Sequence, residues 1–256
     1  MLSYARKLEP YICSSLLLSK VTYTLSAKTM NIRHLNLGHL NRLLHRRFLA
    51  GILALTGFMP LCAISINANI SEEITEALEL APNVKNGEKI YPLCASCHMK
   101  NGWGKKDGSF PVIAGQHRNV LVKQLADIRS KNRENPTMYP FTDPGSIGGM
   151  QGISDVTAYI ATMEKDPEPG VGDGQNLDLG KSIYQKRCLQ CHGDKGQGNN
   201  EAFFPSLKGQ HHAYLLRQLK WIRDGYRKNA NEAMMVEVKA LSDDELDAVA
   251  DYLSRL

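Results

Sequence analysis

The sequence predicts an all-α protein built from two tandem units of the same fold. Two observations carry the repeat: the pattern CxxCH occurs at 94–98 and again at 188–192, and the 36 residues that begin with each motif align without a gap, with 15 identities. A fixed period of this kind indicates one structural unit built twice. The third observation is that apolar residues elsewhere recur at helical spacing and nowhere alternate as in a strand.

Each CxxCH pattern is the attachment signal for a c-type haem. Two cysteines three residues apart lie on one face of a helical turn, where both sulfurs can form thioethers with one haem. The histidine that follows is then placed to ligate the iron. One motif alone could be a redox or zinc-binding cysteine pair, but two copies at the head of the same longer repeat favour two haem c groups. The expected cysteines and iron-ligating histidines are Cys94, Cys97 and His98, and Cys188, Cys191 and His192.

Residues 1–68 are expected to be a leader that contains a signal peptide. Arginines precede an uncharged stretch at 48–66, and the small residue Ala68 follows at a plausible cleavage point. The uncharged stretch is also long enough to span a bilayer core of ~30 Å, so cleavage and an uncleaved membrane anchor both stay open. Either outcome predicts a periplasmic protein, because the positive charge lies before the apolar stretch.

Charge and cysteine usage exclude several function classes. The whole chain carries a net charge of +5, but the leader holds eight of its basic residues against one acid, and the remainder carries 23 basic and 25 acidic residues. The basic patch that nucleic-acid binding needs is therefore absent from the sequence. Cys13 and Cys62 fall in the leader and haem uses the other four cysteines. No cysteine is left for a disulfide, a catalytic thiol or an axial thiolate.

Each unit is expected to open with a helix that ends on its haem motif, over Val84–His98 and Leu179–His192. Segments rich in glycine and proline follow at 102–116 and 196–210 and predict loops. The next helix shows the i, i+4, i+7 spacing of a single buried face. Its apolar residues are Leu121, Leu125 and Ile128 in the first unit, and Leu215, Leu219, Ile222 and Tyr226 in the second.

A further helix closes each unit. In the second unit Ser242–Glu245 has the form of a capping box, which marks the start of this helix. A polar segment rich in proline and glycine separates the units. We therefore expect domains at 80–165 and 178–256, joined by a linker at 166–177. The apolar residues of the closing helices are Val156, Tyr159, Ile160 and Met163, and Leu246, Val249, Ala250 and Leu253.

Over roughly residues 80–256 the chain resembles two-haem cytochromes c of the cytochrome c4 type. The resemblance is carried by CxxCH, then FPVIAGQH and FPSLKGQH, QLADIR and QLKWIR, a methionine, and a last helix with Ala-Tyr-Ile or Asp-Tyr-Leu. It implies two class I cytochrome c domains, each with iron bound by the motif histidine and a distal methionine. It also implies that the Pro111 and Pro205 carbonyls accept hydrogen bonds from these histidines and orient them. A plain loop-shaping role for both prolines is compatible with this.

The distal methionines are expected to be Met138 and Met234. The resemblance places this ligand eight residues before the serine of the last helix, which gives Met234 rather than its neighbour Met235. In the first unit an extra loop breaks that spacing, and Met138 is favoured because it follows residues shared by both units. Met150, at the start of the last helix, is the alternative. A thioether favours ferrous iron and raises the potential.

The expected function is electron transfer between a respiratory donor and a terminal oxidase or reductase, through redox protein partners and without enzyme activity. The alternatives are a cytochrome subunit of a dehydrogenase complex and a two-haem peroxidase-like enzyme. A peroxidase needs an open distal position on the iron. Thiosulfate-oxidising dehydrogenases use an axial cysteine, and none is left here.

The remaining polar candidates are given simpler interpretations. Histidines that follow the Gly-Gln pairs are expected at the surface or at helix starts, rather than on iron. The lysines after the haem motifs are interpreted as solvated loop residues, with a docking face for partners as the alternative. These residues are His117, His211 and His212, and Lys105, Lys106 and Lys195.

Overall fold

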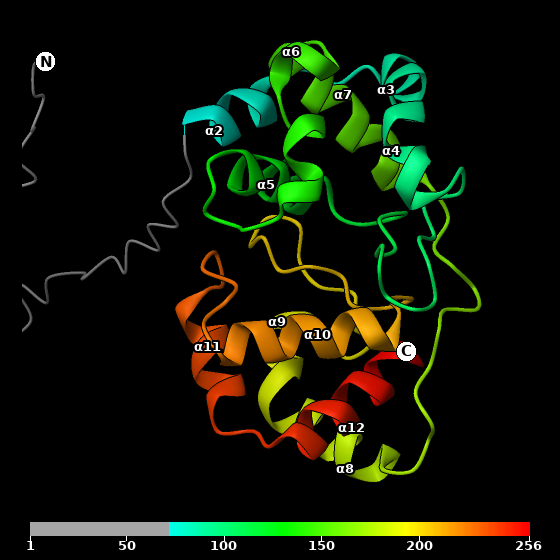
Figure 1. The fold of residues 1–256 in the computed structure, drawn as a ribbon, viewed down its shortest axis with the longest axis vertical. Coiled ribbons are helices and arrows are strands. Elements are labelled where there is room, and N and C mark those ends of the chain that lie inside the picture. The colour runs from blue at the N-terminus through cyan, green and yellow to red at the C-terminus, as the bar shows by residue number, and fades with distance from the viewer. Residues whose placement is uncertain (1–71) are drawn as a thin grey trace, which may run out of the picture. The chain divides into compact units, whose positions relative to one another are not determined.

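A computed structural model describes residues 72–256, and these are helices joined by loops (Figure 1). Across the described residues the only extended pairing is an isolated antiparallel bridge between Asn199 and Phe204, so the predicted all-α class is confirmed. No helix in this part of the chain has the length and apolar character needed to cross a membrane. The expected leader, with its stretch at 48–66, lies outside the described residues.

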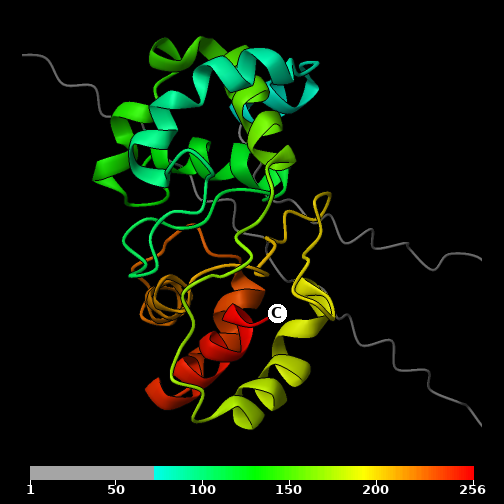
Figure 2. The same cartoon turned by 90° about the vertical axis from the view of Figure 1, so that its right-hand side faces the viewer.

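The two halves repeat one arrangement (Figures 1 and 2). In each half the last helix packs against the helix that leads to the haem motif and against the helix that follows the glycine-rich loop. Both halves belong to one compact unit. The first half contains α2 (Glu72–Glu79), α3 (Val84–Ile90), α4 (Pro92–His98), α5 (Arg118–Arg129), the 3-10 helix η1 (Pro136–Phe141), α6 (Pro144–Ile147) and α7 (Gly149–Thr162). The second contains α8 (Leu177–Ile183), the π-helix η2 (Tyr184–Cys188), α9 (Leu189–His192), α10 (His212–Arg223), α11 (Glu232–Lys239) and α12 (Asp243–Ser254).

A glycine lets the first and last helices of each half cross in close contact. A Cβ atom on Gly87 of α3 would lie 2.1 Å from the carbonyl oxygen of Asp155 in α7. A Cβ atom on Gly180 of α8 would lie 2.1 Å from the carbonyl oxygen of Ala248 in α12. Any larger residue at either position would push the two helices apart, so these crossings fix the frame that carries the haem motifs.

The helix that leads to each haem motif is interrupted, and the interruption has a different form in each half. Two residues separate Tyr91 from Cys94, but three separate Tyr184 from Cys188. In the first half the chain divides at Tyr91, and Pro92 begins α4, where its missing N–H costs nothing. In the second half the extra residue is absorbed by the π-helix η2. The expected continuous helices are therefore wrong in detail, although both runs end on their motifs.

The second half has one apolar core between α8, α10 and α12. The predicted buried face of α12 is confirmed, since Leu246 is fully buried and its three companions are at most 2 % exposed. The capping box is confirmed too, with the Glu245 N–H donating to Ser242 Oγ at 3.2 Å. Tyr226 was expected on the α10 stripe, but α10 ends at Arg223 and Tyr226 is 69 % exposed.

The first half begins with an additional helix, α2, that was not predicted from the sequence. Helix α2 precedes residue 80, where the first domain was expected to begin, and it packs against α5 and α7. Its residues Ile74 and Ala77 are buried in a cluster with Val122 and Ile153. This cluster adds apolar contacts that have no counterpart in the second half.

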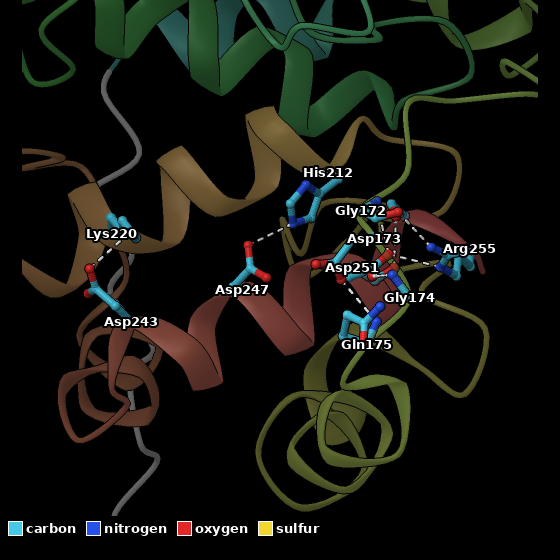
Figure 3. Close-up of polar contacts among 11 residues, drawn as sticks. Gly172, Asp173, Gly174, Gln175, His212, Lys220, Asp243, Asp247, Asp251 and Arg255 are labelled. Atoms are coloured by element: carbon cyan, nitrogen blue, oxygen red, sulfur yellow. Dashed lines mark hydrogen bonds and ion pairs between the residues drawn. The ribbon is translucent and has the colours of Figure 1, made fainter.

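The segment between α7 and α8 is held against α12 by one carboxylate (Figure 3). Asp251 accepts hydrogen bonds from the backbone N–H groups of Gly172 at 2.9 Å and Gly174 at 2.7 Å. Arg255 donates to the same carboxylate at 2.8 Å and to the Gly172 carbonyl at 2.8 Å. The linker is thereby attached to the second half rather than left free.

Candidate functional site

The four motif cysteines are half-buried, and none of these four forms a disulfide. Cys94 packs against a core cluster of the first half, and Cys188 packs against the core of the second. Burial raises the pKa of both thiols to about 11. Reactive cysteine pairs have a lowered pKa instead. These two thiols therefore lack the electrostatics of a redox pair, which weakens the alternative interpretation of the motif.

The motif histidines are buried, and each directs one ring nitrogen to a backbone carbonyl. Nδ1 of His98 lies 2.9 Å from the Pro111 oxygen, and Nδ1 of His192 lies 3.0 Å from the Pro205 oxygen. A carbonyl only accepts, so Nδ1 carries the proton and Nε2 carries the lone pair. Burial lowers the pKa of both imidazoles and outweighs the opposing effect of the hydrogen bond. Both rings are thus neutral at neutral pH, as a metal ligand requires.

Loop glycines position these carbonyls. Gly104 and Gly198 have φ values of 64° and 71°, in the left-handed region that favours glycine. A Cβ atom would lie 2.2 Å from the Phe110 oxygen at Gly104, and 2.4 Å from the Phe204 oxygen at Gly198. The N–H of Gly104 donates to the His98 carbonyl at 3.1 Å. Each loop therefore folds back tightly onto the end of its haem motif.

In each half, two thiols on one helical segment and a neutral imidazole with an available Nε2 form a donor set that fits haem c. The methionine candidates differ in their surroundings. Met138 lies half-buried in η1, whereas Met150 packs against the cluster of α2, α5 and α7. The latter contact gives Met150 a packing role. Met234 and Met235 are successive residues of α11 and both contact the second core.

Two equivalent glutamines join the halves reciprocally. Gln116 accepts from the Ser206 N–H and donates to the Ser206 carbonyl, both at 2.9 Å. Gln210 accepts from the Val112 N–H at 3.0 Å and donates to the Val112 carbonyl at 2.8 Å. Val112 and Ser206 are themselves equivalent in the repeat, so each half binds the other through the same residues.

The histidines after these glutamines extend the reciprocal contact. Nε2 of His117 lies 2.7 Å from the backbone carbonyl oxygen of Gln197, and Nε2 of His211 lies 2.7 Å from the backbone carbonyl oxygen of Trp103. Each lies immediately before a helix, as expected for a residue at a helix start, but a surface position is wrong for His211, which is 1 % exposed. Its Nδ1 accepts from the Gly170 N–H at 3.0 Å, so this ring joins both halves and the linker.

The remaining histidine and lysine candidates do not take part in this contact between the halves. His212 lies 3.1 Å from Asp247 of α12 (Figure 3). Lys105, Lys106 and Lys195 are exposed, in agreement with solvated loops.

Sequence reasoning missed the interface role of the repeated Gln-His pairs. A usable signal was present, because both pairs recur at identical loop positions where neither a haem ligand nor a core residue was expected. Identical polar residues in two copies of one unit are suited to a self-complementary contact between the copies.

Comparison with known proteins agrees with this geometry. The cytochrome c family model matches residues 84–164 and 177–256. The chain is 34% identical over 202 residues to a thiosulfate dehydrogenase electron acceptor from Stutzerimonas stutzeri, covering 70% of this chain and 90% of that protein. It is 35% identical over 178 residues to cytochrome c4 from Thiocapsa roseopersicina, covering 66% and 89%. The crystal structure of reduced cytochrome c4 from Pseudomonas stutzeri superposes with a TM-score of 0.62 at 28% identity, covering 69% of this chain and all of that one.

Proposed function

The chain belongs to the cytochrome c family and binds two haem c groups, and from this premise we propose that it is a periplasmic electron carrier. Its partners would be a respiratory donor and a terminal oxidase or reductase. The observation that carries the proposal is that both halves hold an equivalent set of two cysteines and one histidine, with each imidazole hydrogen-bonded to a proline carbonyl. Two equivalent sites suit a carrier better than an enzyme with one specialised centre.

The cysteines and histidines of the proposed ligand set come from these donor sets, and the methionines come from the resemblance to two-haem cytochromes. When bound, haem c supplies a one-electron ferric–ferrous couple. The histidines would ligate the iron through Nε2, while the Nδ1 hydrogen bonds to proline carbonyls fix the rings and would raise their basicity. The methionine thioethers would be further iron ligands and would favour the ferrous form. The proposed set is Cys94, Cys97, His98 and Met138 with the Pro111 carbonyl, and Cys188, Cys191, His192 and Met234 with the Pro205 carbonyl.

A second, narrower proposal is that the electron donor is a thiosulfate-oxidising dehydrogenase. The observation that favours it is the similarity to a thiosulfate dehydrogenase electron acceptor over 90% of the length of that protein. The test is to mix oxidised protein with such a dehydrogenase and thiosulfate and follow haem reduction. Thiosulfate without the enzyme is the control and should give no reduction. Absence of reduction with the enzyme would leave the general carrier and contradict this donor.

The carrier proposal is tested by haem stoichiometry, location and turnover. Purified protein should hold two haems per chain that resist acid–acetone extraction, and the Cys94→Ala/Cys97→Ala variant should hold one. The native protein should fractionate with the periplasm, and cleavage of the leader would give a mature chain that starts near Asn69. Retention of the 48–66 segment in membranes would instead support the anchored form. Extractable haem, or rapid turnover of peroxide by the protein alone, would contradict the proposal.

A further inference from the structure

Two lysines line a cavity between the segment that follows α7, a loop of the second half and the C-terminal residues. The cavity has a volume of about 290 Å³, and Lys165 and Lys208 both contribute to its lining. The other charged side chains of the lining are Asp166, Glu168 and Arg255. A cavity of this size holds more than one water molecule, so it has room for a group added to either lysine.

The Lys165 side chain is held in place by two loop glycines. A Cβ atom on Gly115 would lie 2.9 Å from Cγ of Lys165, and one on Gly209 would lie 3.5 Å from Cβ of Lys165. Gly115 and Gly209 are equivalent residues of the two halves, so the lysine stem lies against both loops. The side chain is half-buried and its Nζ atom is not fully buried, so a small reactant can reach the amine.

No carboxylate neutralises either lysine. Among the described residues, neither Lys165 nor Lys208 forms an ion pair, and neither Nζ atom takes part in a hydrogen bond. The Asp166 carboxylate accepts a backbone N–H at 2.9 Å, and the Arg255 guanidinium is paired with Asp251 at 2.8 Å. The two lysines are therefore neighbouring like charges without a counter-ion, which favours the loss of one proton.

The ionisation of Lys165 agrees with this arrangement. Burial, followed by the charge of Lys208, lowers the pKa of Lys165 from 10.5 to about 8. At pH 8 about half of the Lys165 amine is therefore neutral, whereas an amine with the usual lysine pKa is almost entirely protonated. A lysine is nucleophilic in its neutral form, so Lys165 combines a reactive amine with a cavity that can hold a product.

We propose that Lys165 is a carbon dioxide site, at which its amine forms a carbamate beside Lys208. The lone pair of the amine nitrogen forms a bond to the carbon of carbon dioxide. One carbon–oxygen π bond breaks and its electron pair moves to that oxygen, while a proton leaves the nitrogen for solvent. The step needs no oxidant and has no leaving group. It does not involve haem and goes beyond the proposed electron transfer.

The charge of the product is the reason for choosing carbon dioxide as the reactant. Carbamate formation changes the charge at Lys165 from positive to negative. An acyl donor would leave a neutral amide, and an aldehyde would leave a neutral or positive imine. Of these products, the carbamate alone gives Lys208 the counter-charge that the protein does not supply, and opposite charges at short range stabilise each other.

The test uses the two-haem protein in isotopically labelled bicarbonate at pH 8. Carbamates are trapped by alkylation with a trialkyloxonium salt and located by peptide mass spectrometry. We expect at least about tenfold more label on Lys165 than on exposed Lys186, because a large share of the Lys165 amine is neutral at this pH. At constant dissolved carbon dioxide, the label on Lys165 should decrease as the pH falls from 8 to 6, because the amine becomes protonated.

Three variants separate the roles of the two lysines. Lys165→Arg keeps the positive charge and removes the nucleophile, so the label at this position should be lost. Lys208→Met should reduce the label on Lys165 several-fold, because the carbamate loses its counter-charge. Lys208→Arg keeps that charge and should retain the label. This conservative pair distinguishes an effect of charge from a general effect of substitution at position 208.

Absence of label on Lys165 in the folded two-haem protein would overturn the proposal, and so would equal label on Lys165 and Lys186. Undiminished label in Lys208→Met would overturn the role of Lys208. Calorimetry measures bicarbonate binding without a covalent step. Equal binding to Lys165→Arg and to the unmodified protein, with no label in either, would assign the cavity to a free anion instead. Haem content measured in the same samples separates a failure of the proposed function from a failure of this site.

Discussion

Gln116 and Ser206 are joined by two hydrogen bonds of 2.9 Å, in which one side-chain amide pairs with both backbone groups of a residue in the other half. The equivalent residues Gln210 and Val112 make the same pair of bonds in the opposite direction. This is the arrangement of an isologous dimer, in which residue i contacts j and j contacts i. Here it is built within a single chain, so both copies of the repeat are constrained by the contact.

We predict that Gln116→Ala destabilises the protein by about 2 to 4 kcal/mol, because it leaves the Ser206 N–H and carbonyl without their partner. Gln210→Ala should cost a similar amount, since Val112 loses the same two bonds. Chemical denaturation of the two-haem protein measures both changes. Gln175→Ala is the matched control, because Gln175 is exposed in the linker. Stability equal to that of the control would show that the glutamines do not hold the interface.

Local sequence rules predicted those parts of the fold that depend on neighbours in the chain. The capping box at Ser242 and the buried face of α12 follow from residue spacing alone, and both are confirmed. The π-helix was not predicted, because the extra residue between Tyr184 and Cys188 lies before the point at which the gap-free match of the two units begins. The spacing of Ile74, Ala77 and Leu78 is typical of one apolar face on α2, but the packing of that face against α5 and α7 depends on tertiary contacts.

The candidate site likewise has residues that the sequence predicts and contacts that only the tertiary structure shows. The cysteine and histidine donors are defined by a spacing of a few residues, so the sequence was sufficient to propose them. The contacts of His211 with Trp103 and Gly170 join residues far apart in the chain. The hydrogen bonds from Arg133 to Gln218 and from Arg227 to Gln124 likewise form only where the two halves meet. Such contacts can be identified only from the tertiary structure.

We predict that Met138→Ala and Met234→Ala each remove about half of the methionine-to-ferric-haem absorption band near the red end of the visible spectrum. Each should also lower one potential, because loss of the thioether removes its preference for ferrous iron. Absorption spectra and redox titration measure these effects. Met150→Ala and Met235→Ala are the controls and should keep the band. Loss of the band in Met150→Ala would move the first ligand to that residue.

We predict that Asp251→Asn destabilises the protein by about 2 to 3 kcal/mol at pH 7, because a charged acceptor of two backbone N–H groups is lost. Burial alone would raise the pKa of this carboxyl, but its hydrogen bonds from Arg255, Gly174 and Gly172 hold it below 3.8. A depressed carboxyl pKa stabilises the fold above the usual value, and this contribution is lost as the pH falls through the folded pKa.

Denaturation measured from pH 7 to pH 2 tests this prediction. The difference between Asp251→Asn and the unmodified protein should be constant near neutrality and narrow below about pH 4. Asp244→Asn, an exposed change on the same helix, serves as the control. Equal stability of Asp251→Asn and the unmodified protein at pH 7 would show that this carboxylate does not hold the linker.

Lys165, which follows α7, should make the protein more stable as the pH rises from 8 to 10.5. Its stem lies against Gly115 and Gly209, equivalent loop glycines of the two halves. Burial, followed by the charge of Lys208, lowers its pKa from 10.5 to about 8. Between these values the unfolded chain binds more protons than the folded one, so stability increases with pH. Lys165→Met keeps the apolar stem and removes the charge. It should stabilise the protein at pH 7 by at most about 3 kcal/mol, less where solvent screens the charge.

The stability gained by Lys165→Met should vanish near pH 10.5. Lys186→Met is the control at an exposed position, and its stability relative to the unmodified protein should not change with pH. A pH-independent difference between Lys165→Met and the unmodified protein would show that Lys165 keeps its ordinary pKa in the fold.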